Sequence, residues 1–210
     1  MSALPARRAV MTLYADPQDP LGHAVRLVLA EKGVLSDIRF VSEDNKPEDL
    51  HHLNPYGRIL TLVDRDLVLY DALTMMEYLD ERYPHPPLMP VDPTGRANNR
   101  QLRYRVMQDL YSALPHLRGG NEIAAAGARK AIRDNLTAIA PAFQRLPYFM
   151  SQDFTLVDCL MAPLLLRLKH YGVALPPQGK PIQGYTQRLF ERPAFLGGLS
   201  RHELALREAR

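Results

Sequence analysis

The sequence predicts an α/β domain followed by an all-α domain, and three observations support this division. Up to Arg82, short apolar segments alternate with helical patterns. The segment Pro84–Pro90 then interrupts the pattern, because four prolines in seven residues cannot continue a helix. After it, helical periodicity persists almost to the end of the chain. We therefore expect one domain over residues 9–87 and a second over residues 94–210, which suits a chain of 210 residues.

The first domain begins with strand and helix signals in alternation. Val10–Ala15 is a short apolar run, typical of a buried strand. Pro20 suits the first turn of a helix and Gly33 suits the residue just after its end. Ile38–Val41 is the second apolar run. These features predict a strand-helix-strand unit.

In the rest of this domain the sequence predicts a short helix, a hairpin and a longer helix. The short helix ends at Asn54, before a proline. Leu60–Val63 and Leu67–Tyr70 flank three polar residues, which indicates a tight hairpin. Asp71 suits the cap of a helix that runs through Arg82. The order β-α-β-(α)-β-β-α is a thioredoxin-like arrangement.

The second half of the chain carries helical spacing in four stretches, with few strand signals between them. We expect helices over Thr94–Leu114, Ala124–Phe143, Thr155–Tyr171 and Ile182–Arg192.

One of these helices begins with a recognisable cap and contains the single cysteine. Thr155 and Asp158 have the spacing of a capping box. Cys159 follows them, and its apolar neighbours predict a buried core residue rather than a nucleophile. A lone cysteine also excludes an intramolecular disulfide and a CxxC redox pair.

The net charge of +3 averages over two unlike halves. Residues 1–90 carry 9 Lys/Arg against 14 Asp/Glu, whereas residues 91–210 carry 17 against 9. Arg96, Arg100 and Arg103 form one helical stripe in the basic half. Such a stripe is either a solvated face or a secondary basic face that steers an acidic partner. Weak or indirect DNA contact also stays open, although no nucleic-acid motif is present.

Other chemistries and locations are not indicated. The seven histidines are scattered without metal-ligand spacing, and no phosphate-binding loop is present. No apolar run reaches the length of about 18 residues that a membrane helix needs. We expect no metal, no membrane contact and a cytoplasmic location.

Motifs spread over most of the chain resemble the glutathione transferase superfamily. They are Val25-Arg26 with Leu29 to Gly33, Asn54-Pro55 with Gly57, Thr61 to Asp64, Glu77 to Pro84, and Phe154 to Leu156 with Asp158. This resemblance implies an N-terminal thioredoxin-like domain and a C-terminal helical domain.

A narrower resemblance is to the stringent starvation protein A family, and Met76–Pro90 is its most specific part. It implies a transcription regulator that associates with RNA polymerase holoenzyme, through the core or the sigma factor, and forms a homodimer. It also implies that Pro84, His85 and Pro86 form a surface patch needed for regulation. Tyr83 and Arg65 are weaker neighbours of that patch.

The residues expected to handle glutathione depart from the transferase pattern. Asp19 stands where many such enzymes have Ser or Cys, and a carboxylate repels a thiolate; we expect it to cap the helix. Leu60 replaces a cis proline, and a non-proline cis bond costs roughly 2.5–4 kcal/mol, so the geometry is expected to be lost or strained. Asp71 keeps the acid of an acid-serine pair, but Ala72 replaces the serine.

We therefore expect no enzymatic activity and no glutathione cofactor. Two alternatives stay open. One is a glutathione-dependent transferase or isomerase with an atypical site, for which Tyr14 is the nearest hydroxyl. The other is a scaffold with neither activity.

Overall fold

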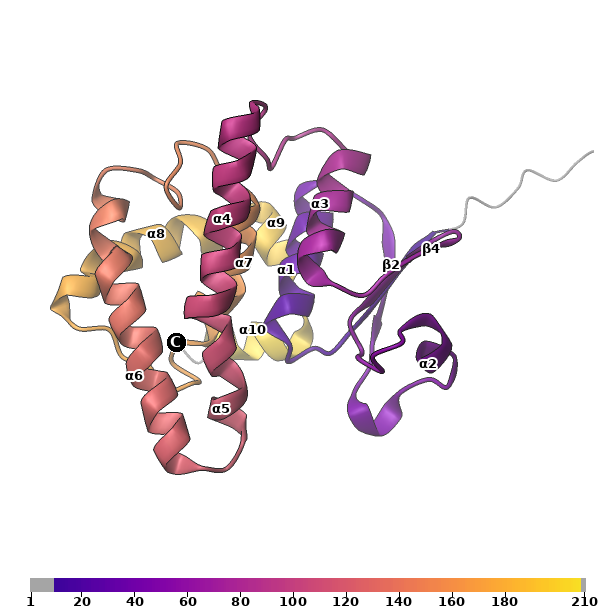
Figure 1. Cartoon of the computed structure of the whole chain (residues 1–210), viewed down its shortest axis with the longest axis horizontal. Helices are drawn as coiled ribbons and strands as arrows, with labels where there is room; N and C mark the ends of the chain where they lie inside the picture. Colours follow the sequence, from indigo (N-terminus) through magenta and orange to yellow (C-terminus); the bar gives the residue numbers. More distant parts are fainter. Residues whose placement is uncertain (1–9, 209–210) are drawn as a thin grey trace, which may run out of the picture.

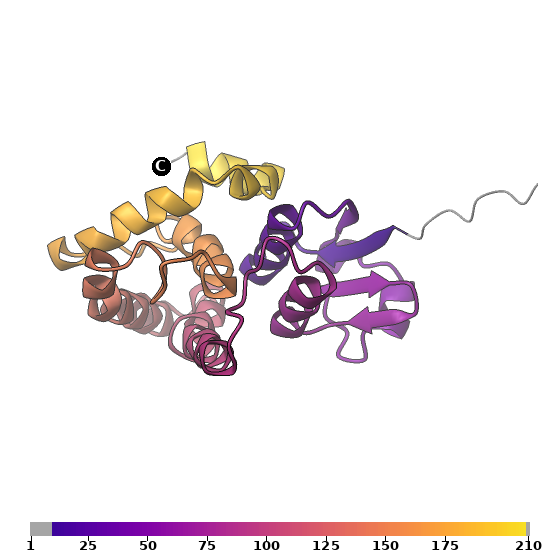
Figure 2. The ribbon, with the colours of Figure 1, turned by 90° about the horizontal axis from the view of Figure 1, so that it is seen from above.

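A computed structural model gives the fold of residues 10–208 (Figure 1). Residue 9, at which the first domain was expected to begin, and residues 209–210 lie outside the described residues. Figure 2 shows a sheet-containing part beside a helical part, with the segment after α3 (Ala72–Arg82) connecting them. This confirms the expected α/β plus all-α architecture.

The first domain is built on a sheet with the strand order β2-β1-β3-β4. Its strands are β1 (Met11–Ala15), β2 (Ser36–Phe40), β3 (Thr61–Asp64) and β4 (Leu67–Leu69). β1 pairs in parallel with β2, placing Leu13 opposite Ile38, and antiparallel with β3, placing Leu13 opposite Leu62. β3 and β4 form the expected hairpin.

Strand β2 covers Ser36–Phe40 rather than the expected Ile38–Val41. It is an edge strand, and its pairing with β1 includes Ser36 and Asp37. Pairing depends on backbone groups, so polar side chains on an exposed edge do not end the strand. The apolar run therefore marked only part of it.

Successive residues of β1 face opposite sides of the sheet, as a strand requires. Leu13 and Ala15 belong to the main core, whereas Tyr14 belongs to a small cluster with Val41 and Leu50. Helices α1 (Pro20–Glu31) and α3 lie between the sheet and the second domain, and α2 (Asp49–Leu53) lies on the outer side (Figures 1 and 2).

The ends of α1 and α3 match the sequence prediction. The Asp19 carboxylate accepts hydrogen bonds from the backbone N–H groups of Leu21 and Gly22, both at 3.2 Å. At the other end Gly33 has φ of 61°, a left-handed conformation that glycine adopts at little cost. Asp71 caps α3 by accepting from the Thr74 N–H at 2.8 Å.

The second domain consists of helices joined by turns. They are α4 (Pro93–Asp109), α5 (Leu114–Arg118), α6 (Glu122–Ile139), α7 (Leu156–Arg167), α8 (Lys180–Phe190), α9 (Pro193–Gly197) and α10 (Arg201–Glu208). The expected helix Thr94–Leu114 is therefore divided. A 3₁₀ turn, Tyr111–Ala113, separates α4 from α5, which begins just before Pro115. Proline lacks the N–H group that a continuous helix would need there.

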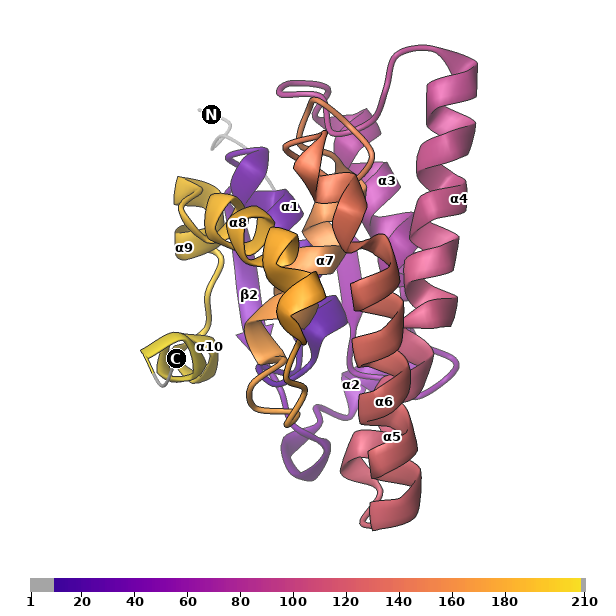
Figure 3. The same ribbon diagram turned by 90° about the vertical axis from the view of Figure 1, so that its left-hand side faces the viewer.

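Helix α7 is the centre of the second domain, and Figure 3 shows it surrounded by neighbouring helices. Every residue from Leu156 to Arg167 is buried, and α7 packs on both α1 and α4. Its capping box is confirmed, because Thr155 and Asp158 exchange side-chain to backbone hydrogen bonds. Asp158 also accepts from the Tyr185 hydroxyl at 2.7 Å, which ties α8 to the start of α7.

Candidate functional site

The segment after α3 forms an exposed ridge, which we define as residues Tyr83–Pro87 and call the proline ridge. Pro84, His85, Pro86 and Pro87 are exposed and Tyr83 is half-buried. The chain then turns inward, because Leu88 and Met89 are 2% and 5% exposed and belong to the main core. The ridge crosses the top of the molecule between α3 and α4 in Figure 1. Of the residues that the sequence singled out, Pro84, His85 and Pro86 are thus consecutive and exposed.

A buried ion pair holds the proline ridge from below. Lys32 and Asp80, 8% and 6% exposed, contact each other at 2.6 Å between Nζ and Oδ1. The same ammonium group donates to the Pro86 carbonyl oxygen, and Asp80 Oδ1 accepts from the Leu88 N–H at 2.8 Å. Both partners therefore fix the backbone on either side of Pro87.

The second domain also holds this segment. The Leu156 N–H, at the start of α7, donates to the Leu88 carbonyl oxygen at 2.9 Å. The ridge is therefore anchored to α1, α3 and α7 together. A surface held in one conformation loses little entropy when a partner binds.

Arg65 is exposed in the β3–β4 turn, with φ of 57°. Its neighbour Asp64 accepts from the Tyr78 hydroxyl at 2.6 Å and lies 3.8 Å from Arg82 Nε. The Arg82 guanidinium in turn lies 5.7 Å from the centre of the Tyr83 ring. Contacts through α3 thus connect the turn that carries Arg65 to the start of the ridge.

The arginine stripe on α4 does not form the free basic face that the sequence allowed. Arg96 pairs with Glu81 at 3.0 Å, and Arg100 pairs with Glu77 at 3.0 Å. Arg103 also pairs with Glu77 and is only 2% exposed, so its inclusion in an exposed face was wrong. The stripe joins α4 to α3 across the domain boundary.

Glu77 is the centre of this ion-pair cluster. Partial burial opposes its ionisation, but hydrogen bonds from Arg100 and Arg103 outweigh that effect and lower its pKa. The sequence could not show this, because the acidic partners lie on a helix that precedes the stripe by a full linker.

Asp19 lies at the N-terminus of α1, where a transferase would hold the glutathione sulfur. Its carboxylate already occupies two of the free N–H groups of the helix, and burial raises its pKa despite those hydrogen bonds. A cleft of about 550 Å³ beside it is lined mainly by apolar parts of α4 and α5, including Met107, Tyr111 and Leu114. The helix N-terminus is thus capped by the protein itself.

Tyr14 does not point into that cleft. It lies on the outer side of the sheet, where its hydroxyl accepts from Arg39 Nη1 at 3.2 Å. Within residues 10–208 the cis peptide bond is His85–Pro86 alone, so the bond between Ile59 and Leu60 is trans. The cis geometry of the transferase pattern is therefore absent at Leu60.

Ala72 is 4% exposed and presents no donor next to Asp71. A hydroxyl group outside the two predicted positions lies close by. The Thr74 Oγ1 donates to Asp71 Oδ1 at 2.8 Å, which ties the acid into the cap of α3. The two positions of the expected acid-serine pair, Asp71 and Ala72, are therefore the N-terminal cap and the first residue of α3.

A buried charge cluster that the sequence did not reveal joins α1, α7 and α10. Glu203 is fully buried and pairs with Arg26 at 2.7 Å and with Arg167 at 2.5 Å. His23 Nδ1 lies 3.2 Å from the same carboxylate. The only signal in the sequence was Arg167, which ends the longest apolar run in the chain.

This cluster shifts the pKa values of two of its members. Burial lowers the pKa of His23 to about 4, although Glu203 opposes this shift. Burial works against the charge of Glu203, but His23 and Arg26 outweigh it and hold its pKa well below the usual range. At neutral pH the cluster contains a neutral histidine, an ionised glutamate and two arginines.

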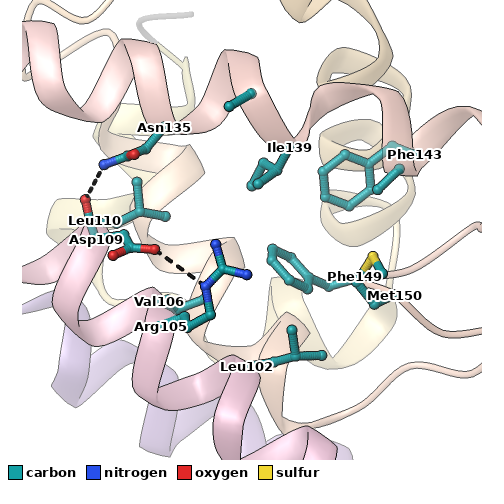
Figure 4. Close-up of a pocket in the computed structure, with 12 residues that line it drawn as sticks. Leu102, Arg105, Val106, Asp109, Leu110, Asn135, Ile139, Phe143, Phe149 and Met150 are labelled. Atoms are coloured by element: carbon teal, nitrogen blue, oxygen red, sulfur yellow. Dashed lines mark hydrogen bonds and ion pairs between the residues drawn. The ribbon is translucent and has the colours of Figure 1, made fainter.

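An apolar pocket of about 250 Å³ lies between α4 and α6 (Figure 4). Leu102, Ile139, Phe143 and Phe149 point into it, and Arg105 lies across it with Nε 3.6 Å from Asp109. The pocket contains an ion pair but no free nucleophile. It is a hollow between packed helices, lined by apolar side chains and this ion pair.

Other reactive groups are not assembled into a site. Over residues 10–208 no group of His, Cys, Asp and Glu has a metal-binding arrangement. Cys159 is fully buried, and burial raises the pKa of its thiol well above the usual value. Among the described helices, none is long and apolar enough to span a membrane.

Comparison with known proteins agrees with this architecture. Residues 20–82 match the glutathione S-transferase N-terminal domain family and residues 102–193 match the C-terminal domain family. A glutathione S-transferase from Xylella fastidiosa superposes with a TM-score of 0.83 at 19% identity, over 92% of this chain and 98% of its own. The fold is that of the glutathione transferase superfamily.

Two curated relatives define the family more narrowly. The stringent starvation protein A homolog of Haemophilus influenzae is 50% identical over 93% of this chain and 93% of its own. That of Coxiella burnetii is 48% identical over 96% of this chain and 97% of its own. The chain belongs to the stringent starvation protein A family.

Proposed function

We propose that this protein is a transcription regulator that associates with RNA polymerase holoenzyme and acts through protein contacts, without glutathione chemistry. The observation that carries the proposal is the proline ridge, exposed on its outer side and anchored from below by Lys32 and Asp80. A rigid surface with an aromatic residue and a histidine is typical of a protein docking site. Membership of the stringent starvation protein A family supports RNA polymerase, through its core or sigma factor, as the partner.

The absence of glutathione chemistry is supported by three positions. Asp19 caps α1 with its own carboxylate, Leu60 follows a trans peptide bond, and Ala72 offers no hydroxyl. A thiolate at this place would meet a negative carboxylate rather than a donor. We therefore propose neither enzymatic activity nor a glutathione cofactor.

We also propose that the protein is cytoplasmic and that two copies associate. Exposed aromatic side chains support an association surface: Tyr56 and Tyr70 contact each other edge to face at 5.5 Å, and Tyr104 on α4 is 57% exposed. The acidic first half and basic second half are complementary in charge. We propose only weak or indirect contact with DNA.

The deciding experiment is co-purification with RNA polymerase, combined with a promoter assay. The ridge variant Pro84→Ala/His85→Ala should lose both the bound polymerase and the promoter effect while its melting temperature stays unchanged. The chain offers a matched control, because Pro115-His116 on α5 is another exposed proline-histidine pair. Pro115→Ala/His116→Ala should retain both activities. If the ridge variant also retains both, the ridge is not the docking site.

The rival function, a glutathione-dependent transferase or isomerase, has its own test. Glutathione and a generic electrophile are incubated with the protein, and conjugate formation is measured. We expect no turnover above the uncatalysed rate. Turnover that Tyr14→Phe abolishes would overturn the proposal in favour of the enzyme. A scaffold with neither activity would show no turnover and no bound polymerase.

A further inference from the structure

A further hollow, of about 450 Å³, lies on the side of the molecule where α5, α6, α7 and α10 converge. We call it the cationic pocket, because its walls include Arg118, Arg129 and Arg167; His170 and His202 also line it. None of the described residues that line it is acidic. It is separate from the proline ridge, and it shares Arg118 with the cleft beside Asp19.

The positive charges in this pocket are unequally compensated. Arg167 is neutralised from behind by the buried Glu203 at 2.5 Å. Arg129 pairs with Glu122, whose side chain is 81% exposed and therefore easily displaced. Arg118 donates to the Gln18 carbonyl oxygen at 3.1 Å, and among the described residues the Asp19 carboxylate interacts with it electrostatically without forming an ion pair. The pocket thus has a net positive charge.

The wall of the pocket also contains a donor that lacks an acceptor. Tyr171 is 8% exposed, and its buried hydroxyl has no hydrogen-bond partner among the described residues. The Arg118 guanidinium faces this hydroxyl without forming a hydrogen bond of ordinary geometry. Buried hydroxyls are almost always paired, so an unpaired one beside a guanidinium that has no carboxylate partner indicates a missing acceptor.

We propose that the cationic pocket binds the phosphate group of a small phosphorylated metabolite. A guanidinium group can donate two parallel hydrogen bonds to phosphate oxygens, and the Tyr171 hydroxyl supplies a further donor. The volume falls within the range of small-ligand sites. This inference does not depend on the proposed role at RNA polymerase.

The geometry favours a small ligand over a nucleic acid. The three arginines come from separate helices, α5, α6 and α7, and surround one hollow. A phosphodiester backbone requires charges in a row along an open surface. The row of arginines on α4, which has that form, is occupied by ion pairs with α3.

The test is titration calorimetry of the whole protein with inorganic pyrophosphate. Arg118→Gln should weaken binding at least about tenfold, because a charge-assisted hydrogen bond is lost. Arg133→Gln is the control, since it removes the same charge from a position on α6 outside the pocket whose side chain is 43% exposed. Equal weakening by both variants, or no pyrophosphate binding at all, would overturn the proposal.

Tyr171→Phe separates a binding role from a structural one. It removes only the unpartnered hydroxyl, so the melting temperature should be unchanged or higher while pyrophosphate binding weakens. A lower melting temperature with unchanged binding would contradict the assignment. Comparing pyrophosphate with a nucleoside diphosphate tells whether the ligand is inorganic or a nucleotide. Tight duplex DNA binding that Arg118→Gln abolishes, without pyrophosphate binding, would replace the proposal with a nucleic-acid site.

Discussion

Arg26 and Glu203 are 177 positions apart in the chain and form a buried two-pronged ion pair between the domains. The Nη1–Oε2 distance is 2.9 Å and the Nη2–Oε1 distance is 2.7 Å. Arg26 comes from α1 of the first domain, and Glu203 comes from α10 near the end of the chain. The last helix is thus attached to the first domain by charge as well as by packing.

Glu203→Gln should be strongly destabilising, because it leaves Arg26 and Arg167 buried without a counter-charge. Breaking a buried pair in this way costs about 3–5 kcal/mol in free energy of unfolding. Urea denaturation followed by circular dichroism measures it. Glu43→Gln is the control, since the Glu43 side chain that pairs with Lys46 is 72% exposed and its change should cost less than about 1 kcal/mol. Similar losses in the free energy of unfolding of the two variants would show that the buried cluster contributes little to stability.

His23 predicts a fall in stability between about pH 6.5 and pH 4. Its pKa is about 4 in the folded protein against 6.5 ordinarily, so over this interval the unfolded chain binds a proton that the folded chain does not. Stability therefore rises with pH here, by on the order of 3 kcal/mol in total. Glu203, whose pKa is lowered, acts in the same direction only as the pH falls below its unfolded value.

The measurement is a series of urea denaturation curves across that pH interval. His23→Gln should be less stable at pH 7 and show a flatter pH dependence from 6.5 to 4. His116→Gln, at an exposed site on α5, should follow the wild-type curve. A wild-type slope that survives in His23→Gln would assign the pH dependence to other groups.

Arg103 and Arg100 should differ in their contribution to stability although both pair with Glu77. Arg103 is 2% exposed, so Arg103→Gln should lower the free energy of unfolding by about 1.5–3 kcal/mol. Arg100 is 48% exposed, and Arg100→Gln should cost less than about 1 kcal/mol. Thermal and urea unfolding of the two variants give the comparison. A docking role for the stripe predicts instead that Arg100→Gln weakens polymerase binding at full stability.

Lys32→Met should loosen the proline ridge without altering its exposed side chains. The change removes the ammonium group that holds the Pro86 carbonyl, and it leaves Asp80 with the Leu88 N–H as its remaining partner. Hydrogen exchange at the Leu88 amide should become faster, and polymerase co-purification should weaken.

Lys46→Met is the matched control for that variant. Lys46 also pairs with a carboxylate, Glu43, and donates to a carbonyl oxygen, that of Gly57. It lies away from the ridge, so its loss should leave Leu88 exchange and polymerase binding unchanged. Equal effects of the two lysine variants would mean that Lys32 acts through general stability.

The ends of the helices were predictable where a single residue with a strong preference for a helix end marks them. Asp19, Gly33 and Asp71 each mark an end through their own chemistry, and the structure has α1 and α3 where they indicated. The first residue of β2 was not predictable, because pairing of an edge strand does not require apolar side chains.

The candidate site was predictable only in its local part. The proline ridge is continuous in sequence, so its residues could be found together. Its anchor, Lys32 with Asp80, and the cluster around Glu203 depend on how distant helices pack. For the same reason the sequence could not show that α3 supplies the partners of the α4 stripe.

The burial of the single cysteine has a practical consequence. Cys159 is inaccessible in the folded state and has a raised thiol pKa, so thiol reagents should modify it only when the protein unfolds. Its labelling rate is therefore a reporter of global opening that needs no engineering. His85→Cys would add the one fast-reacting thiol, and a photo-crosslinker attached there would mark whichever protein docks on the ridge.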